Sequence, residues 1–309
     1  MKTFLRNLLF GVVPVTEYST ITIEGGINER VYLRVEEKNI DISATHWLLC
    51  LDPIVFGIWF SKEGDVVSFN KVAVYKMYFA DSETGTNVVA ALKLKFFDKI
   101  EGPDGTLVLL SLSDVRIYHV NFLRTWLLFY KYYKKPEQDF HKLKSYSAAY
   151  SYPRRVRLVS FRDENWFNIF PMDLVGDVPF SGRYVFGLRH SNVTLSRIIK
   201  DGKIAVSEIP YEYKNIIYQL GKHHRKAMSD SSLPFGLIKS EFFDFPIPEW
   251  ADSYKEIRIV DNMNLGSHML LWGEEINQKS IRGPHGNLFH IHFLYYTHLR
   301  RRGMAYPLV

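Results

Sequence analysis

The chain is poor in cysteine and in long hydrophobic runs. Cys50 is the only cysteine among 309 residues, which excludes an internal disulfide and a metal cluster built on several thiolates. The longest apolar stretch, Trp47 to Phe60, is interrupted by Asp52-Pro53 and is too short to cross a bilayer. We therefore expect a cytoplasmic, soluble protein without a membrane partner.

Long runs of one charge are missing as well. The 39 basic residues outnumber the 33 acidic ones and give a net charge of +6, but the two signs are interspersed along the chain. The denser basic groups are short and lie at residues 131–135, 154–157, 222–226 and 300–302. Because no zinc-finger spacing or RNA-binding aromatic motif accompanies them, we expect no nucleic-acid partner.

The beginning of the chain has only part of a secretion signal. A short apolar run at residues 8–15 follows basic residues, but it contains Pro14 and lacks a small-x-small cleavage site. We expect the first structured segment here.

What is abundant is apolar and aromatic material, at 47% and 15% of the chain, enough for one large domain or two ordinary ones. Runs of β-branched and aromatic residues between turn signals predict strands at 20–23, 66–78, 88–97 and 107–112. A helix is predicted within 131–153, between Pro136 and Pro153. We predict a β-rich domain over 1–150 and a second domain over 151–309.

The second domain mixes strands with two helices. One helix is capped by Asn192, carries Leu195, Ile198 and Ile199 on one face and ends at Gly202. The other spans 213–220 before Gly221, and strands are predicted at 155–160, 204–209, 257–259, 269–272 and 288–296. This order predicts a mainly β fold with inserted helices, an α+β arrangement on an antiparallel barrel, rather than a doubly wound parallel sheet.

Residues 189–194 combine a cation with hydroxyl and amide donors at a predicted helix start. Arg189, Ser191, Asn192 and Thr194 are suited to hold a phosphate, because a helix amino terminus offers unpaired N–H groups and partial positive charge. The alternative is an ordinary helix cap at Asn192, with the other residues incidental.

A second segment lies about twenty residues upstream, after a predicted strand. Its amide, aromatic and thioether side chains suit a flat heteroaromatic ligand, although a packed loop over the core explains them nearly as well. The residues are Asn168, Ile169, Phe170, Pro171, Met172 and Asp173.

These two segments, followed by Gly266-Ser267-His268-Met269, resemble the succession found in the flavin reductase-like, FMN-binding split-barrel family over about residues 154–280. The resemblance implies FMN with its phosphate at 191–194 and its ring near 168–173. Reductases of this family carry a Gly-Asp-His element at the nicotinamide site, and Ser267 here replaces the acid. The resemblance implies NAD(P)H as the electron donor and His268 as the candidate catalytic residue, while the missing acid departs from the family's nicotinamide site.

The histidines allow other interpretations. His290 and His292 share a strand face and, with His285 and His298, are possible metal ligands, but no matching carboxylate spacing supports a metal site. His224, in the basic group after the second helix, is either part of a cationic helix end or a lid over the flavin.

The first domain offers no comparable motif, but residues 105–133 faintly echo 288–302. A divergent, duplicated barrel standing in for a dimer partner would explain the echo, and so would coincidence in a β-rich chain. We therefore predict a homodimer or a pseudo-dimer of fused barrels. The function implied by the resemblance is that of an NAD(P)H-dependent flavin reductase or related oxidoreductase. The alternative is a non-catalytic split-barrel protein that binds a small ligand or a protein partner.

Overall fold

The computed structural model describes residues 18–63, 69–82, 87–124, 127, 140–164, 166–226, 228, 233–283 and 286–309. The first structured segment expected at residues 8–15, the basic run 131–135 and His285 lie outside the described residues. No helix in the described part of the chain is long and apolar enough to span a membrane.

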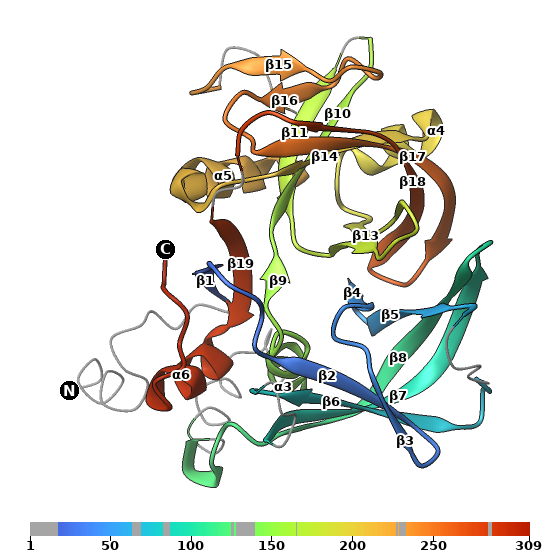
Figure 1. The fold of residues 1–309 in the computed structure, drawn as a ribbon, viewed down its shortest axis with the longest axis vertical. Coiled ribbons are helices and arrows are strands. Elements are labelled where there is room, and N and C mark those ends of the chain that lie inside the picture. The colour runs from blue at the N-terminus through green and yellow to red at the C-terminus, as the bar shows by residue number, and fades with distance from the viewer. Residues whose placement is uncertain are drawn as a thin grey trace.

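The first large sheet has seven antiparallel strands in the order β3-β2-β6-β7-β8-β5-β4. It occupies the lower part of Figure 1. The predicted strands at 88–97 and 107–112 lie within its two longest strands. The bounds are β2 Arg30–Val35, β3 Lys38–Asp41, β4 His46–Leu51, β5 Ile54–Ser61, β6 Val74–Ala80, β7 Val88–Glu101 and β8 Gly105–Ile117.

The second large sheet also has seven antiparallel strands, in the order β11-β10-β14-β17-β18-β13-β12. It forms the upper part of Figure 1, with two helices at its periphery, α4 Leu195–Asp201 and α5 Lys214–Leu220. The bounds are β10 Arg157–Arg162, β11 Phe167–Met172, β12 Val175–Val178, β13 Arg183–Arg189, β14 Lys203–Glu208, β17 Ser253–Asn264 and β18 His268–Ser280.

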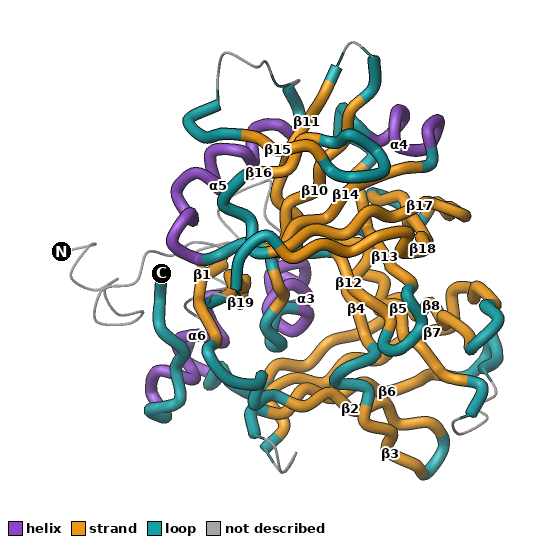
Figure 2. The backbone as a smooth tube through the Cα atoms, turned by 45° about the horizontal axis from the view of Figure 1, so that its top comes forward, coloured by secondary structure: helices purple, strands orange, loops and turns teal. Residues whose placement is uncertain are grey.

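A three-stranded sheet, β1-β19-β9, joins the beginning and the end of the described chain. Strand β1 (Tyr18–Ile23) pairs with β19 (Asn287–His292), which also pairs with β9 (Arg154–Arg155). Helices α3 (Phe140–Ala149) and α6 (Phe293–Arg301) lie beside this sheet (Figure 2). The remaining elements are β15 Leu237–Lys239, β16 Pro246–Pro248 and the 3-10 turns η1 Tyr211–Tyr213 and η2 Gly221–His224.

The two large sheets have the same strand order when their strands are matched along the chain. When the seven strands of each sheet are paired one by one in chain order, from β2 with β10 to β8 with β18, the first strand order becomes the second. This is the result that a duplicated barrel requires, and duplication itself stays a prediction. In this matching β8 corresponds to β18, so the sequence echo between 105–133 and 288–302 does not follow the topology.

The halves meet in an apolar cluster formed by β4, β5 and β8 against β13 and β18. Trp59 stacks on Trp272 with ring centroids 5.7 Å apart. Close approach depends on Gly176, where a Cβ would lie 1.9 Å from the ring of Trp47. Glycine therefore stands at the point where the second sheet contacts the indole of Trp47 in the first.

The predicted mainly β fold with inserted helices is confirmed, but several boundaries are wrong. The strand expected at 288–296 ends at His292, whose Nδ1 accepts a hydrogen bond from the N–H of Leu294 and thereby starts α6. Gly221 does not stop the second helical segment, because its right-handed backbone continues into η2. The predicted strand at 66–78 begins only at Val74 among the described residues.

Candidate functional site

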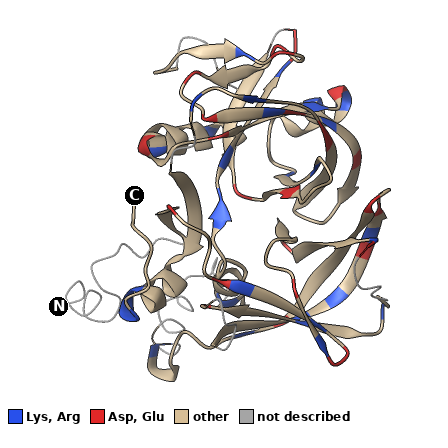
Figure 3. Cartoon of the chain, viewed as in Figure 1, with Lys and Arg blue, Asp and Glu red and all other residues tan. Residues whose placement is uncertain are grey.

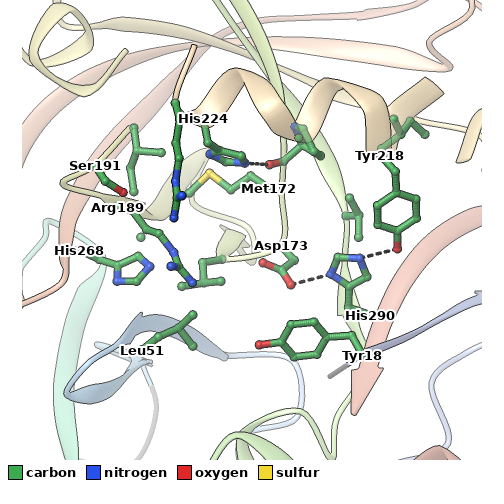
Figure 4. Close-up of a pocket in the computed structure, with 18 of the residues that line it drawn as sticks. Tyr18, Leu51, Met172, Asp173, Arg189, Ser191, Tyr218, His224, His268 and His290 are labelled. Atoms are coloured by element: carbon green, nitrogen blue, oxygen red, sulfur yellow. Dashed lines mark hydrogen bonds and ion pairs between the residues drawn. The ribbon is translucent and has the colours of Figure 1, made fainter. Parts of the chain in front are cut away.

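A cavity of about 380 Å³ lies at the junction of the two halves. Figure 4 shows Arg189, Ser191 and His268 on one side and Asp173, His290 and Tyr218 on the other. Its volume falls in the range of ordinary small-molecule sites, about 300 to 1,000 Å³. Seven of the predicted site residues line it: Pro171, Met172, Asp173, Arg189, Ser191, His224 and His268.

One end of the cavity is rich in cations. Arg189 extends from the end of β13, and Lys222 and Arg225 come from η2 and the residue after it. All three are exposed, and none has a carboxylate partner among the described residues. The hydroxyl of Ser191 faces the same space. Three unpaired cations with a hydroxyl form an arrangement suited to a phosphate.

The walls between the two ends are largely apolar. Met172, Leu188 and Pro171 come from the second sheet, and Leu51 comes from β4 of the first. Two tyrosines complete the lining from the amino-terminal part: Tyr18, the first residue of β1, and Tyr150, which directly follows α3. The cavity is therefore built by both halves of a single chain.

The far end holds a hydrogen-bonded group around Asp173. Its Oδ2 accepts from Nδ1 of His290 at 2.8 Å and from the hydroxyl of Tyr150 at 3.1 Å. On the other side of the imidazole, Nε2 of His290 lies 2.8 Å from the hydroxyl of Tyr218. Burial alone would raise the pKa of Asp173, but the hydrogen bonds from His290 and Tyr150 and the charge of His290 hold it below its usual value. The group therefore presents a stable carboxylate.

In the turn that precedes α4, where the sequence predicts an anion site, two backbone N–H groups are hydrogen-bonded within the protein. Oδ1 of Asn192 accepts from the N–H of Thr194, and the N–H of Val193 donates to the carbonyl of His224. Asn192 and Thr194 are buried. The predicted cap at Asn192 is therefore displaced: Thr194 is the N-cap of α4 and makes no side-chain cap hydrogen bond, while Asn192 bonds within the turn before it.

The other predicted residues outside the cavity lining also hold this turn. Nδ2 of Asn168 donates to Oγ1 of Thr194 and to the carbonyl of His223, both at 2.8 Å. Phe170 is fully buried, with its ring centroid 4.9 Å from that of His224. Direct flavin contact by Asn168, Phe170, Asn192 and Thr194 stays a prediction, and their hydrogen bonds and burial favour a supporting role instead.

His224 connects the turn to the cavity. Its Nε2 donates to the carbonyl of Pro171 at 2.8 Å, and its Nδ1 accepts from Nδ2 of Asn192 at 2.9 Å. These partners fix the neutral tautomer with hydrogen on Nε2, because a carbonyl only accepts and an amide nitrogen only donates. Burial lowers the pKa of His224, which agrees with a neutral ring.

His268 lies at the cation end, at the start of β18. Its Nδ1 is 2.8 Å from Oγ of Ser267 and 3.6 Å from Sγ of Cys50. Burial, and next the charge of Arg189, lower the pKa of His268 to about 4. At neutral pH this imidazole is uncharged and serves as a polar contact rather than as a proton source.

No three His, Cys, Asp or Glu side chains in the described ranges are grouped as metal ligands would be. Sequence reasoning considered His290 only as a metal ligand and missed Lys222, Arg225, Leu51, Tyr18, Tyr150 and Tyr218 as lining residues. The basic group at 222–226 was a signal for Lys222 and Arg225. The others required the tertiary packing of the two halves.

The fold is similar to that of FMN-binding and flavin reductase split barrels. An FMN-binding protein from Thermus thermophilus matches with 18% identity and a TM-score of 0.37, over 42% of this chain and 72% of that one. An NADH:FAD oxidoreductase from Streptomyces globisporus matches with 17% identity and a TM-score of 0.44, over 48% and 88%. The flavin reductase component of a bacterial tryptophan halogenase matches with 11% identity and a TM-score of 0.42, over 48% and 91%.

These likenesses concern the fold and cover less than half of the chain. No family model matches the sequence, and no curated protein matches it.

Proposed function

We propose that the chain is a flavin-binding protein of the oxidoreductase class and that FMN occupies the cavity between its halves. The observation that carries the proposal is the combination of three unpaired cations, Arg189, Lys222 and Arg225, with an apolar slot. A phosphate-bearing, flat ligand matches this division, because its charge and its ring need opposite surroundings.

In this proposal the cations and Ser191 hold the phosphate, and Pro171, Met172 and Leu51 contact the ring. The carboxylate of Asp173, which His290 and Tyr150 hold in place, faces a polar edge of the ring. Asn168, Asn192 and Thr194 hold the turn that carries Ser191. A bound flavin supplies the redox chemistry, and the protein contributes orientation, polarity and access.

FMN titration followed by flavin absorbance tests the proposal. Replacing Lys222 and Arg225 by alanine together should weaken binding by at least tenfold, since each charge-assisted hydrogen bond is worth about 1.5 to 3 kcal/mol. Arg189→Ala should act in the same direction. The matched control is Arg258→Ala, an exposed arginine on β17 outside the cavity lining. Unchanged affinity in both cation variants, or no binding by the native chain, refutes the site.

NAD(P)H is the electron donor in this proposal, and His268 is its candidate contact in the absence of the family acid at Ser267. Stopped-flow mixing of the flavin-loaded chain with NADH and with NADPH should bleach the flavin. His268→Gln should slow bleaching while flavin affinity stays within a few fold. If neither nicotinamide bleaches the flavin, the alternative of a non-catalytic ligand-binding barrel replaces the enzyme.

The repeated strand order supports a pseudo-dimer of fused barrels, in which residues 1–150 take the part of a second subunit. Leu51, Tyr18 and Tyr150 then complete the cavity from within one chain. Sedimentation equilibrium of the FMN-loaded protein tests this arrangement. A monomer that retains bound FMN is expected, and loss of FMN upon dissociation of a dimer would refute it.

A further inference from the structure

A second cavity, of about 390 Å³, lies between the two large sheets near β9. Figure 3 shows β9 as a blue strand between the upper and lower parts of the molecule. Its two residues, Arg154 and Arg155, line the cavity together with Arg157 of β10. The nearest wall of the first half consists of the segment that leads into β4, from Ser43 to Leu48. Like the first cavity, it is formed by both halves.

Two of the three arginines are neutralised by protein carboxylates. Arg157 contacts Oε1 of Glu208 at 2.6 Å and Oδ1 of Asp177 at 2.9 Å. Arg155 lies 2.9 Å from Oε2 of Glu208 and also donates to the side chain of Asn287. The charges of Arg155 and Arg157 are therefore paired with carboxylates, although Nε of Arg155 and Oε2 of Glu208 form no hydrogen bond among the described residues.

Arg154 is different, although it is as buried as Arg157, with exposed fractions of 6% and 5%. It forms no ion pair among the described residues, and its one hydrogen bond runs from Nη2 to the carbonyl of Ala149 at 3.1 Å. Its Nε is buried without a partner. The guanidinium lies over the rings of Phe56 and Tyr152, at 5.8 and 5.7 Å from their centroids. An isolated cation at this depth is costly unless an anion joins it.

The pKa values of the two arginines differ in the direction that this contrast requires. Burial lowers the pKa of Arg154 to about 10. Burial also acts on Arg157, but the charges of Glu208 and Asp177 outweigh it and raise the pKa of that guanidinium. The acidic residues of the cavity therefore do not offset the burial of Arg154.

A second polar atom of the cavity is also unpartnered. Nδ1 of His46 donates to the carbonyl of Ile42 at 2.8 Å, which leaves Nε2 as an acceptor, and Nε2 is buried without a hydrogen bond in the described part of the protein. The His46 ring contacts Tyr152 edge-on, with centroids 4.8 Å apart, so Tyr152 has His46 and Arg154 as neighbours. Burial lowers the pKa of His46, which keeps the imidazole neutral.

From this arrangement we infer that the second cavity binds a small aromatic monocarboxylic acid, with its carboxylate on Arg154. One free guanidinium matches one negative charge, whereas a dianionic phosphate would require Arg155 or Arg157 to leave Glu208. Tyr152, Trp47 and Phe289 provide an apolar lining for a ring. The neutral side chain of His46 adds a polar group to the same lining.

Acid binding on Arg154 does not require a bound flavin, but the second cavity adjoins the first, because Asp173 lines both. A ligand held there would lie next to the carboxylate that borders the proposed flavin ring. The inference is therefore tested on the full chain both without FMN and loaded with FMN.

The experiment is a ¹⁹F NMR titration with 4-fluorobenzoate in Tris chloride, using neutral 4-fluorobenzamide as the matched probe. We expect saturable binding of the acid and at least tenfold weaker binding of the amide. Arg154→Met should weaken acid binding at least tenfold, whereas Arg258→Met, at an exposed position on β17 outside both cavities, should leave it within twofold. Inorganic phosphate should displace the acid poorly.

Comparable binding of acid and amide, retention of acid binding in Arg154→Met, or stronger binding of phosphate than of acid would overturn the inference. If Arg154→Met does not fold, Ala44→Trp provides the test. Ala44 is exposed and lines the cavity, so an indole there blocks the space and leaves Arg154 in place. Acid binding that survives this substitution also overturns the inference.

Discussion

Glu29 should make the protein less stable as the pH rises. The carboxyl is 1% exposed and accepts hydrogen bonds from the hydroxyls of Tyr306 at 2.6 Å and Tyr295 at 3.2 Å. Burial outweighs these bonds and raises its pKa from 4.5 to about 7. The folded protein therefore retains this proton over a pH interval in which the unfolded chain releases it.

The sign and size of the effect follow from proton linkage. A raised folded-state pKa contributes stability that is fully present below pH 4.5 and is lost as the pH rises through about 7. At 1.36 kcal/mol per pKa unit, the free energy of unfolding should fall by about 2 to 3 kcal/mol between pH 5 and 8 from this group alone. The Glu29→Gln variant lacks this term.

Urea denaturation of the native chain and Glu29→Gln at pH 5, 6, 7 and 8 measures the difference directly. Other titrating groups are common to both proteins and largely cancel, so the Gln variant should gain on the native chain as the pH rises. Glu37→Gln, at an exposed position near β2, is the control and should follow the native profile. Parallel profiles for the native chain and Glu29→Gln would refute the reasoning.

Three further substitutions test the packing. Gly176→Ala should lower the free energy of unfolding by about 1 to 3 kcal/mol in urea denaturation, because its Cβ would overlap the ring of Trp47; a smaller cost would contradict the tight junction. Arg157→Met should lower the free energy of unfolding by about 1.5 to 3 kcal/mol, because it removes charge-assisted hydrogen bonds to the exposed Asp177 and to Glu208, which keeps Arg155; a neutral result would contradict that network. Asn192→Ala should cost about 1 to 2 kcal/mol through the lost bond to Thr194, with the exposed neighbour Ser191→Ala as a nearly neutral control in thermal unfolding.

Local sequence patterns predicted the elements whose causes are local. Gly202 ends α4 in the left-handed conformation that glycine adopts readily, as expected from its position after the apolar residues. The strand β7 lies where β-branched and aromatic residues cluster. The end of β19 was missed because His292 reads as one more strand residue, and its capping contact with Leu294 becomes visible only in the folded chain.

The candidate site was predictable only in part for a related reason. The sequence places Arg189 and Ser191 before a helix, and both line the cavity. It also places Asn192 and Thr194 there, but whether a polar side chain faces a ligand or the protein is decided by what packs on it. Here the side chain of Asn168, on β11, donates a hydrogen bond to the hydroxyl of Thr194. No spacing rule contains that contact.

Asp173 connects the two cavities electrostatically. It lines both, and its negative charge raises the pKa of Arg154 in one and of His268 in the other, although burial outweighs it in each case. Its own hydrogen bonds from His290 and Tyr150 hold it in the charged form. An anion placed on Arg154 therefore adds a second negative charge near Asp173, whereas a phosphate on Arg189 lies at the opposite end of the first cavity. Because Coulomb interactions weaken with distance, occupation of the second cavity should act on the ring end of the first more than on its phosphate end.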